Sequence, residues 1–352
     1  MIYERPRLLV NASAAKQGGA REILLRCIEA INSRDDVKNY IILCPNTEDL
    51  MILFPNVKFI SVSTKGILTY IFSVFFVYYY VFKFRIDSVL SLNNVNIFTG
   101  NRFTYFHQEK AISGSGIRFF LIRSNLSYQA RVKSGVIVVQ SQRIKSRLID
   151  ELAIDAKRII VRWPGVRSVR TEKQCDAKEE LQNYLPWTFF EDIQSKKLAI
   201  LPIYDAFSAH KDYEFFHRLH PILVKKGYIV ISLCPKNSGV GDYSVGLVPK
   251  SIIDELYAIS DLMILISKEE TLCLPLFEFV QTGKPILARK APYLDDFRVR
   301  YSKWLNNVIP IEPSASQACV ERAIDSVSSV PISDASMSML NNGNWDFIGE
   351  KG

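Results

Sequence analysis

Two glutamates in the second half of the chain, Glu270 and Glu278, are separated by the seven residues TLCLPLF. Glu270, with Glu269 as the alternative, belongs to the loop after a predicted strand, Leu262–Ser267, and Glu278 to a helix that Leu274–Pro275 opens. The free N–H groups at a helix start attract phosphate groups and sugar oxygens. Because such a pair of carboxylates often arises by chance, the surrounding strand, proline turn and helix carry the prediction of a binding site for this kind of ligand.

Four residues elsewhere suggest a ligand as well. Lys211 begins a predicted helix, where the helix dipole disfavours a cation, so an anionic partner is expected. His107 follows the predicted strand Phe103–Phe106, and ligands of parallel sheets bind at the carboxyl ends of strands. Gly18 and Gly19 immediately precede another predicted helix. Each also has an ordinary explanation: a solvated lysine, a satisfied core histidine, a simple turn.

These residues require a scaffold of strands alternating with helices. Strands spaced by helices of 10–15 residues, some of them uninterrupted apolar runs, indicate βαβ units and parallel sheets buried on both faces. The predicted strands are Arg7–Ala12, Tyr40–Cys44, Val57–Val62, Ser88–Leu92, Phe103–Phe106, Val136–Gln140, Arg158–Arg162, Leu198–Ile203, Tyr228–Leu233, Tyr243–Val248, Leu262–Ser267, Pro285–Ala288 and Asn307–Ile311. The predicted helices are Ala20–Asn32, Arg143–Leu152, Lys211–Lys226, Ser251–Ile259, Leu274–Gln281 and Ser316–Val327.

The alternation is interrupted once, in a polar and charged stretch after Trp163-Pro164-Gly165. We therefore predict two doubly wound α/β domains, residues 1–170 and 198–330, with a linker at 171–197 and a tail at 331–352 that packs back on the first domain. The cleft between two such domains is the expected site.

The segment Ile67–Phe82 carries no charge and is followed by Lys83 and Arg85. As a helix it is short of the roughly 20 residues that a bilayer requires, and its four tyrosines are unsuited to mid-membrane. The first interpretation is therefore a buried or half-buried helix of an α/β domain. The second is an interfacial helix on an anionic membrane surface, and a spanning helix is the last of the three.

The net charge of +8 on 352 residues is unevenly distributed. Residues 1–173 carry +13 and residues 174–352 carry −5, which argues against one uniform nucleic-acid-binding surface. A nucleic-acid binder based on the Arg/Lys-rich stretch Val132–Lys173 is the weakest hypothesis, so we expect no nucleic-acid partner. The six scattered cysteines contain no C-x-x-C pair and fit a reducing cytoplasm.

The segment Ile266–Ile286, ISKEETLCLPLFEFVQTGKPI, resembles the P-S-x-x-E-G-F-G-L-P-x-x-E-A-x-A-x-G-x-P-V pattern of the family 4 retaining glycosyltransferases. That family has the GT-B architecture of two Rossmann-like domains. Most of the chain is covered in family order, although each motif is degenerate. The further matching segments are Lys16–Gly19, Tyr105–Gln108, Val136–Gly165, Leu198–Leu223 and Leu247–Asp261.

The resemblance implies a role for each matching residue. Glu278 would hydrogen-bond the ribose of a nucleotide-sugar donor, and Glu270 would hold hydroxyls of the transferred sugar. His107 would lie near the acceptor and the transferred sugar, so that His107 and Glu270 would be the catalytic residues, and Lys211 would pair with the diphosphate. The residues implied to approach the donor through their backbone are Gly18, Gly19, Leu247, Val248, Thr271, Leu272 and Cys273.

The sequence departs from the family pattern in two places. The family's diphosphate-clamping arginine is missing from Leu201–Asp205, which leaves Arg289 and Lys290 as the nearest candidates. Thr271 and Cys273 replace the glycines of E-G-F-G, so we expect either a narrower sugar pocket or a donor that binds in a different position.

No D-x-D motif is present, and no third ligand joins His217 and His220, so we expect no metal and no cofactor beyond the donor. The resemblance therefore implies a metal-independent, retaining transfer from a UDP- or GDP-linked sugar. The acceptor would be a glycan or a polyprenyl-diphosphate-linked oligosaccharide of a bacterial surface polysaccharide, O-antigen or capsule. The expected location is the cytoplasm, peripheral at the inner face of the cell membrane and in contact with anionic lipid. A non-catalytic protein of the same fold is the alternative.

Overall fold

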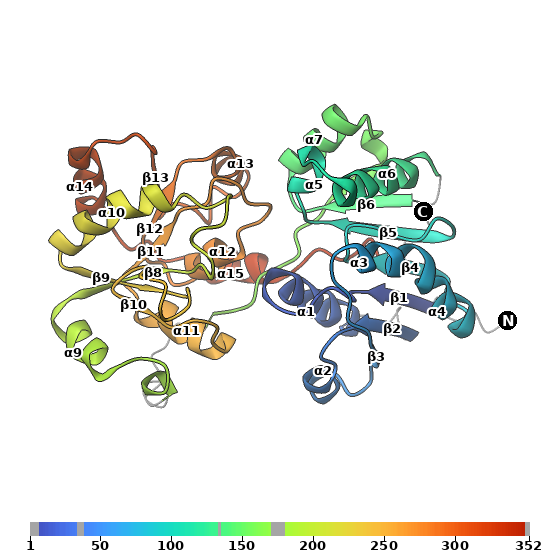
Figure 1. Cartoon of the computed structure of the whole chain (residues 1–352), viewed down its shortest axis with the longest axis horizontal. Coiled ribbons are helices and arrows are strands. Elements are labelled where there is room, and N and C mark those ends of the chain that lie inside the picture. Colours follow the sequence, from blue (N-terminus) through green and yellow to red (C-terminus); the bar gives the residue numbers. More distant parts are fainter. Residues whose placement is uncertain (1–6, 34–38, 133–134, 170–179, 349–352) are drawn as a thin grey trace. The chain divides into compact units, whose positions relative to one another are not determined.

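The computed structural model describes residues 7–33, 39–132, 135–169 and 180–348, which form two α/β units (Figure 1). Unit 1 comprises residues 1–166 together with residues 342–352, and unit 2 comprises residues 167–341. Each unit has its own parallel sheet, so the predicted fold class of two doubly wound domains is confirmed.

The sheet of unit 1 has seven parallel strands in the order β3-β2-β1-β4-β5-β6-β7. Leu9 of β1 lies opposite Ile41 of β2 and Val89 of β4. The elements of unit 1 are β1 (Arg7–Asn11), α1 (Gly18–Asn32), β2 (Asn39–Cys44), α2 (Glu48–Leu53), β3 (Lys58–Ser61), α3 (Ile67–Ile71), the π-helix η1 (Phe72–Phe76), α4 (Val77–Phe84), β4 (Ser88–Ser91), β5 (Asn101–Phe106), α5 (Lys110–Ser113), α6 (Ile117–Arg131), β6 (Gly135–Val139), α7 (Gln142–Leu152), η2 (Ala156–Arg158) and β7 (Ile159–Val161).

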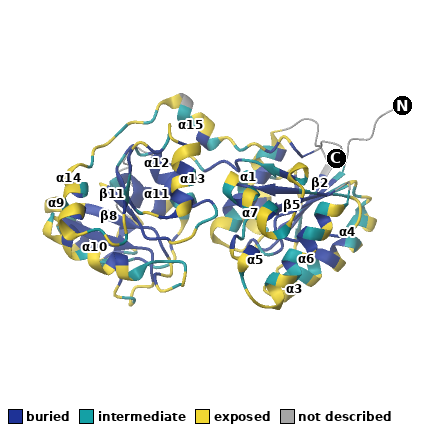
Figure 2. Ribbon diagram, turned by 90° about the horizontal axis from the view of Figure 1, so that it is seen from above, coloured by how far each residue is buried: buried dark blue, intermediate teal, exposed yellow. Residues whose placement is uncertain are grey.

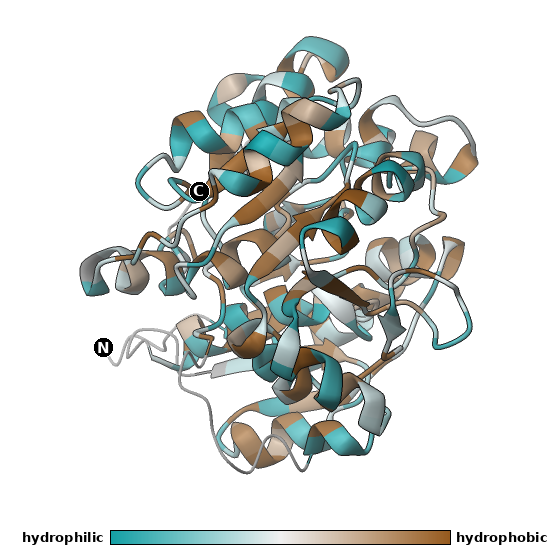
Figure 3. Cartoon of the chain, turned by 90° about the vertical axis from the view of Figure 1, so that its left-hand side faces the viewer, coloured by the Kyte–Doolittle hydropathy of each residue, from teal (hydrophilic) through white to brown (hydrophobic). Residues whose placement is uncertain are grey.

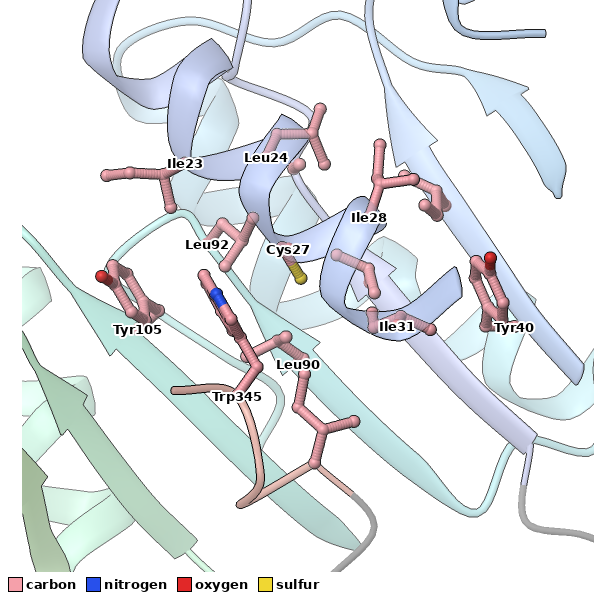
Figure 4. Packing of buried hydrophobic residues seen from close by; sticks show 14 of the residues in the cluster. Ile23, Leu24, Cys27, Ile28, Ile31, Tyr40, Leu90, Leu92, Tyr105 and Trp345 are labelled. Carbon is pink, nitrogen blue, oxygen red and sulfur yellow. The ribbon is translucent and has the colours of Figure 1, made fainter. Parts of the chain in front are cut away.

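Helix α1 and the segment 345–348 cover one face of this sheet, and both contribute to one apolar core (Figure 4). Trp345 is buried there, with its ring 5.4 Å from that of Tyr105 and its Nε1 donating a hydrogen bond to the carbonyl oxygen of Pro164 at 3.0 Å. The segment around Trp345 is therefore an integral part of unit 1.

The opposite face of the same sheet is covered by α3, η1, α4 and α6 (Figure 2). The first three are consecutive and form one helix, Ile67–Phe84, which is the only helix among the described residues that is long and apolar enough to cross a membrane by length and composition. Only 17% of its 18 residues are buried, namely Ser73, Val74 and Val77. The helix thus belongs to the α/β unit and is largely exposed.

The sheet of unit 2 has six parallel strands in the order β10-β9-β8-β11-β12-β13. Figure 3 shows its strands as mostly hydrophobic, and α10 and α14 pack in the same core. The elements of unit 2 are α9 (Trp187–Ser195), β8 (Lys197–Leu201), α10 (Tyr213–Lys225), β9 (Tyr228–Ser232), β10 (Tyr243–Ser244), α11 (Lys250–Ile259), β11 (Leu262–Leu265), α12 (Leu274–Val280), β12 (Ile286–Arg289), α13 (Pro292–Arg300), β13 (Val308–Ile311), α14 (Gln317–Asp325) and α15 (Asp334–Asn341).

Several details differ from the sequence-based expectations, among them helix α6, which was not predicted. The predicted strand Tyr243–Val248 is wrong beyond Ser244, because the chain turns at Gly246, whose φ of +76° is in the left-handed region. Part of the predicted linker, 170–179, lies outside the described residues, and its remainder contains α9, which packs in unit 2: Tyr243 donates a hydrogen bond to Asp192 at 2.7 Å.

Candidate functional site

Three polar side chains meet at the carboxyl ends of β8 and β11 in unit 2. Lys211, in the loop after β8, forms a backbone bridge with Ser267, which follows β11. Its Nζ donates to Ser267 Oγ at 2.7 Å and to Glu270 Oε1 at 2.5 Å, and Ser267 Oγ donates to the same carboxylate oxygen at 2.7 Å. Lys211 and Glu270 were predicted to act on one ligand from segments 59 residues apart, and the structure places them in direct contact.

A second ion pair adjoins the first along the chain. Asp212 caps α10 by accepting a hydrogen bond from the amide of Phe215, and its other oxygen accepts one from Arg289 Nε at 2.6 Å. Burial by itself raises the pKa of Asp212, but the hydrogen bonds from Arg289 and Phe215 outweigh burial and hold that pKa below its ordinary value. The Arg289 guanidinium is thereby fixed beside the residue that follows Lys211.

The two predicted phosphate ligands Arg289 and Lys290 are separated by the structure. Arg289 ends β12 and pairs with Asp212, whereas Lys290 Nζ pairs with Glu312 at 2.5 Å in an exposed position. Of the two, Arg289 alone joins the cluster around Lys211. Asp212 was missed by sequence reasoning, although an aspartate just before a helical segment is a recognised N-cap signal.

Glu278 is deeply buried, with an exposed fraction of 2%. Lys250, the first residue of α11, donates to its Oε2 at 2.5 Å, and the hydroxyl of Tyr257 lies 3.5 Å from the same oxygen. Burial, and next the charge of Glu278, raises the pKa of Tyr257 well above its usual value. Lys250 was also missed, although it follows the predicted base-contact residues Leu247 and Val248 after a single proline.

The loop between Glu270 and α12 is closely packed. Leu272 and Cys273 are buried, whereas Thr271 is half-buried. Cys273 has a φ of +52°, a left-handed conformation that favours glycine, and it stands where the resembling family has the second glycine of E-G-F-G. Of the two predicted base-contact residues, Leu247 is 71% exposed and Val248 is buried.

The remaining predicted residues lie in unit 1. Gly18 and Gly19 are exposed at the start of α1, and Gly18 has a φ of +63°. His107 follows β5, and its amide donates to Asn94 Oδ1 at 2.8 Å. Its Nδ1 is buried without a hydrogen-bond partner among the described residues, and burial lowers the pKa of the imidazole to about 4. His107 is therefore neutral at pH 7.

Within the parts of the chain that the structure describes, no three His, Cys, Asp or Glu side chains come together as a group that could hold a metal ion. Three cations of the candidate site, Lys211, Arg289 and Lys250, are each in an ion pair with a carboxylate. An anionic ligand would share these cations with the carboxylates.

The structure resembles solved glycosyltransferases along nearly its whole length. WaaG, a glycosyltransferase involved in lipopolysaccharide biosynthesis, is 13% identical, with a TM-score of 0.64 over 95% of this chain and 92% of that chain. HepE of Anabaena, solved with UDP and glucose, is 14% identical, with a TM-score of 0.64 over 95% and 94%. Sucrose-phosphate synthase from Thermosynechococcus elongatus is 11% identical, with a TM-score of 0.65 over 98% and 96%.

No protein-family model matches the sequence, and neither does any curated protein. The two parallel-sheet units and the structural neighbours together define the GT-B glycosyltransferase fold. At identities of 11–14%, the likeness concerns the fold.

Proposed function

We propose that the protein is a retaining, metal-independent glycosyltransferase that moves a sugar from a UDP- or GDP-linked donor. The proposed acceptor is a glycan or a polyprenyl-diphosphate-linked oligosaccharide in the assembly of a bacterial surface polysaccharide, at the inner face of the cell membrane. WaaG, described as acting in lipopolysaccharide biosynthesis, and HepE, solved with UDP and glucose, support the donor class and the type of product. Membership of family 4 remains part of the proposal.

The observation that carries this proposal is the cluster of Lys211, Ser267 and Glu270 at the strand ends of a Rossmann-like sheet. In doubly wound sheets, ligands bind at the carboxyl ends of the strands. A lysine and a carboxylate joined through one hydroxyl offer a diphosphate a cation and a sugar an acceptor for its hydroxyl hydrogens. Both are required for a nucleoside-diphosphate sugar.

The proposed chemistry assigns each group one task. As the bond between the sugar C1 and the diphosphate oxygen breaks, negative charge develops on the diphosphate, and Lys211 and Arg289 stabilise that charge. The acceptor oxygen forms the new bond to C1 on the same face, and its proton passes to the departing phosphate oxygen. Glu270 holds sugar hydroxyls, while Glu278 receives the ribose next to Lys250.

Of the candidate residues in unit 1, His107 is proposed to serve the acceptor, and Gly18 and Gly19 the donor. A neutral His107 accepts or donates a hydrogen bond at pH 7 without adding charge, which suits a hydroxyl group near the reacting carbon. Gly18 and Gly19 are proposed to let the loop before α1 approach the donor closely, since neither carries a side chain.

A second candidate function is favoured by the pairing of these cations. Lys211, Arg289 and Lys250 each have a carboxylate partner already, and the usual arginine after β8 is missing. A GT-B-fold protein that binds a nucleotide-sugar, or another partner, without turnover fits the same geometry. Turnover therefore has to be measured separately from binding.

Thermal unfolding with UDP, GDP, ADP and CMP tests binding. A nucleotide at 100 times its dissociation constant stabilises by about 2.7 kcal/mol, which for a unit of this size raises Tm by about 5–10 °C. We expect a shift with UDP or GDP. If none of the four nucleotides changes Tm, both the enzyme and the nucleotide-sugar-binding protein are excluded.

Arg289→Ala and Lys290→Ala form a matched pair for the phosphate contact. They remove neighbouring cations, of which one lies beside Asp212 and the other on the surface with Glu312. We expect Arg289→Ala to weaken nucleotide-diphosphate binding about tenfold or more and Lys290→Ala to leave it unchanged. If the two substitutions change nucleotide-diphosphate binding equally, Arg289 does not contact the diphosphate.

Turnover is measured as nucleoside diphosphate released from candidate nucleotide-sugars. We expect Lys211→Met to lower kcat by about 10²–10³-fold, the cost of losing one donor that stabilises the developing charge. Nucleotide binding without release from any donor, in the presence of acceptor lipid extract, would favour the non-catalytic alternative.

A further inference from the structure

Two neighbouring helices of unit 1 expose large apolar side chains on one side of the molecule. The helix Ile67–Phe84 and α6 lie on the same face of the sheet, where Phe98 contacts Phe75 of the first helix and Tyr128 of α6, with ring centroids 6.3 and 5.0 Å apart (Figure 2). We call these exposed side chains the two-helix face: Leu68, Ile71, Phe75, Phe76, Tyr79, Phe82, Ile117, Phe120 and Tyr128.

All charged side chains of the two helices that form this face are positively charged. Neither Ile67–Phe84 nor α6 contains an aspartate or a glutamate. The exposed cations are Lys83, at the end of the first helix, and Arg118 and Arg131, near the two ends of α6. Lys83 Nζ lies 5.2 Å from the ring centre of Tyr79 and donates a hydrogen bond to its hydroxyl, so its charge sits at the border of an aromatic surface. Apolar and aromatic side chains bordered by cations match an anionic lipid surface.

The packing of the first helix fixes which side chains face outward. Ser73, in the π-helical segment Phe72–Phe76, is fully buried and accepts hydrogen bonds from Asn11 Nδ2 at 2.9 Å and Asn93 Nδ2 at 3.2 Å. Val74 and Val77 are buried with it, while Phe75 and Phe76 are 57% and 59% exposed. The helix is thereby held flat against the sheet, a geometry that suits lying on a bilayer and not crossing it.

We propose that the two-helix face is the surface by which the protein lies on an anionic bilayer, with Phe75, Phe76 and Phe82 inserted among the lipids. This deepens the membrane association included in the proposed function, since it identifies the surface and adds α6 to it. The occupant is a lipid surface because a second copy of this chain would bring the cations of both copies together without an acidic counterpart on the face.

Flotation with vesicles tests the surface directly. The full chain is mixed with vesicles of phosphatidylcholine alone, or of phosphatidylcholine with about one third phosphatidylglycerol, without nucleotide or acceptor. We expect the wild type to float with the anionic vesicles, F75S/F76S/F82S to bind them at least about tenfold more weakly, and Lys83→Glu to bind several-fold more weakly.

The matched control is M51S/I52S/L53S. These α2 side chains are 55%, 81% and 64% exposed, and Leu50 of the same helix belongs to the core on the opposite sheet face. The control should float like the wild type, and circular dichroism should show that both triple variants are folded. The proposal is overturned if the wild type does not float, or if the two triple variants float alike. A lipid-free dimer that F75S/F76S/F82S dissociates would overturn it in favour of a contact between copies. Because no nucleotide is present, failure here leaves the nucleotide-binding test unaffected.

Discussion

The ion pair of Glu278 and Lys250 predicts unequal costs for removing its two partners. The side chain of Glu278 is 2% exposed, whereas the side chain of Lys250 is 32% exposed. Replacing Lys250 with Met leaves the buried carboxylate of Glu278 without a cation, which lowers the unfolding free energy by about 3–5 kcal/mol. Replacing Glu278 with Gln leaves an ammonium group that water can reach, so the expected cost is only about 1–2 kcal/mol.

The double variant K250M/E278Q completes a thermodynamic cycle. Because the Met side chain removes the charge and the Gln side chain no longer needs a cation, the double variant should be more stable than K250M alone. The expected coupling free energy is about 1–3 kcal/mol. Urea unfolding at pH 7, followed by circular dichroism and tryptophan fluorescence, measures all four proteins under the same conditions.

The pair Lys290 and Glu312 provides the control cycle. Its N–O distance is also 2.5 Å, but the two side chains are 44% and 56% exposed. Water and salt screen such a pair, so its coupling should be smaller than that of Lys250 and Glu278 and should decrease further with added salt. If K250M costs no more than E278Q, or if the two cycles give equal coupling, burial does not set the energy of this site.

Two further predictions concern unit 1. Folding lowers the pKa of His107 from 6.5 to about 4, so the unfolded chain binds its proton more tightly, and stability is lost as pH falls from about 6.5 to 4. In NMR titrations the imidazole should remain neutral at pH 5.5, and His107→Gln should remove up to about 3 kcal/mol of this pH dependence; an ordinary titration near 6.5 would contradict the buried environment. Trp345→Ala should destabilise unit 1 by about 3–5 kcal/mol in urea unfolding, whereas Trp187→Ala, at a position 67% exposed, should change stability by less than about 0.5 kcal/mol. Similar effects of the two tryptophan substitutions would show that the end of the chain does not support the core.

The sequence predicted the sheets well because their strands are apolar runs bounded by turns, and parallel pairing follows from the helices between them. The resemblance to the family 4 pattern implied that Lys211 and Glu270 act on one ligand, and in the structure the two side chains are in contact at the carboxyl ends of β8 and β11. The sequence did not predict the polar contacts between Lys211 and Glu270. That Ser267 joins the two side chains depends on loop geometry, which no periodicity reports.

The sequence could not decide between the two candidate phosphate ligands Arg289 and Lys290. Both were candidates because they follow the same strand, but neighbouring residues of an extended chain point to opposite sides. One of the two therefore reaches Asp212 and the other Glu312. The sequence shows that Arg289 and Lys290 point to opposite sides, but it does not show which of the two sides faces Asp212.

Helix α6 was missed and the helix Ile67–Phe84 was ambiguous for one shared physical reason. Sequence patterns identify a surface helix by an apolar inner face and a polar outer face. The helix Ile67–Phe84 is largely apolar on its outer face as well, whereas α6 buries the polar side chains of Asn125 and Gln129 and exposes Ile117 and Phe120. A helix as apolar as Ile67–Phe84 is usually buried on all sides, yet only 17% of its residues are buried. Hydrophobic periodicity does not identify a helix whose exposed side is apolar. The two helices that it did not identify are those that carry the residues proposed to contact lipid. If the flotation test succeeds, Ile117 and Phe120, which α6 exposes beside the first helix, are the next residues to substitute in the same assay.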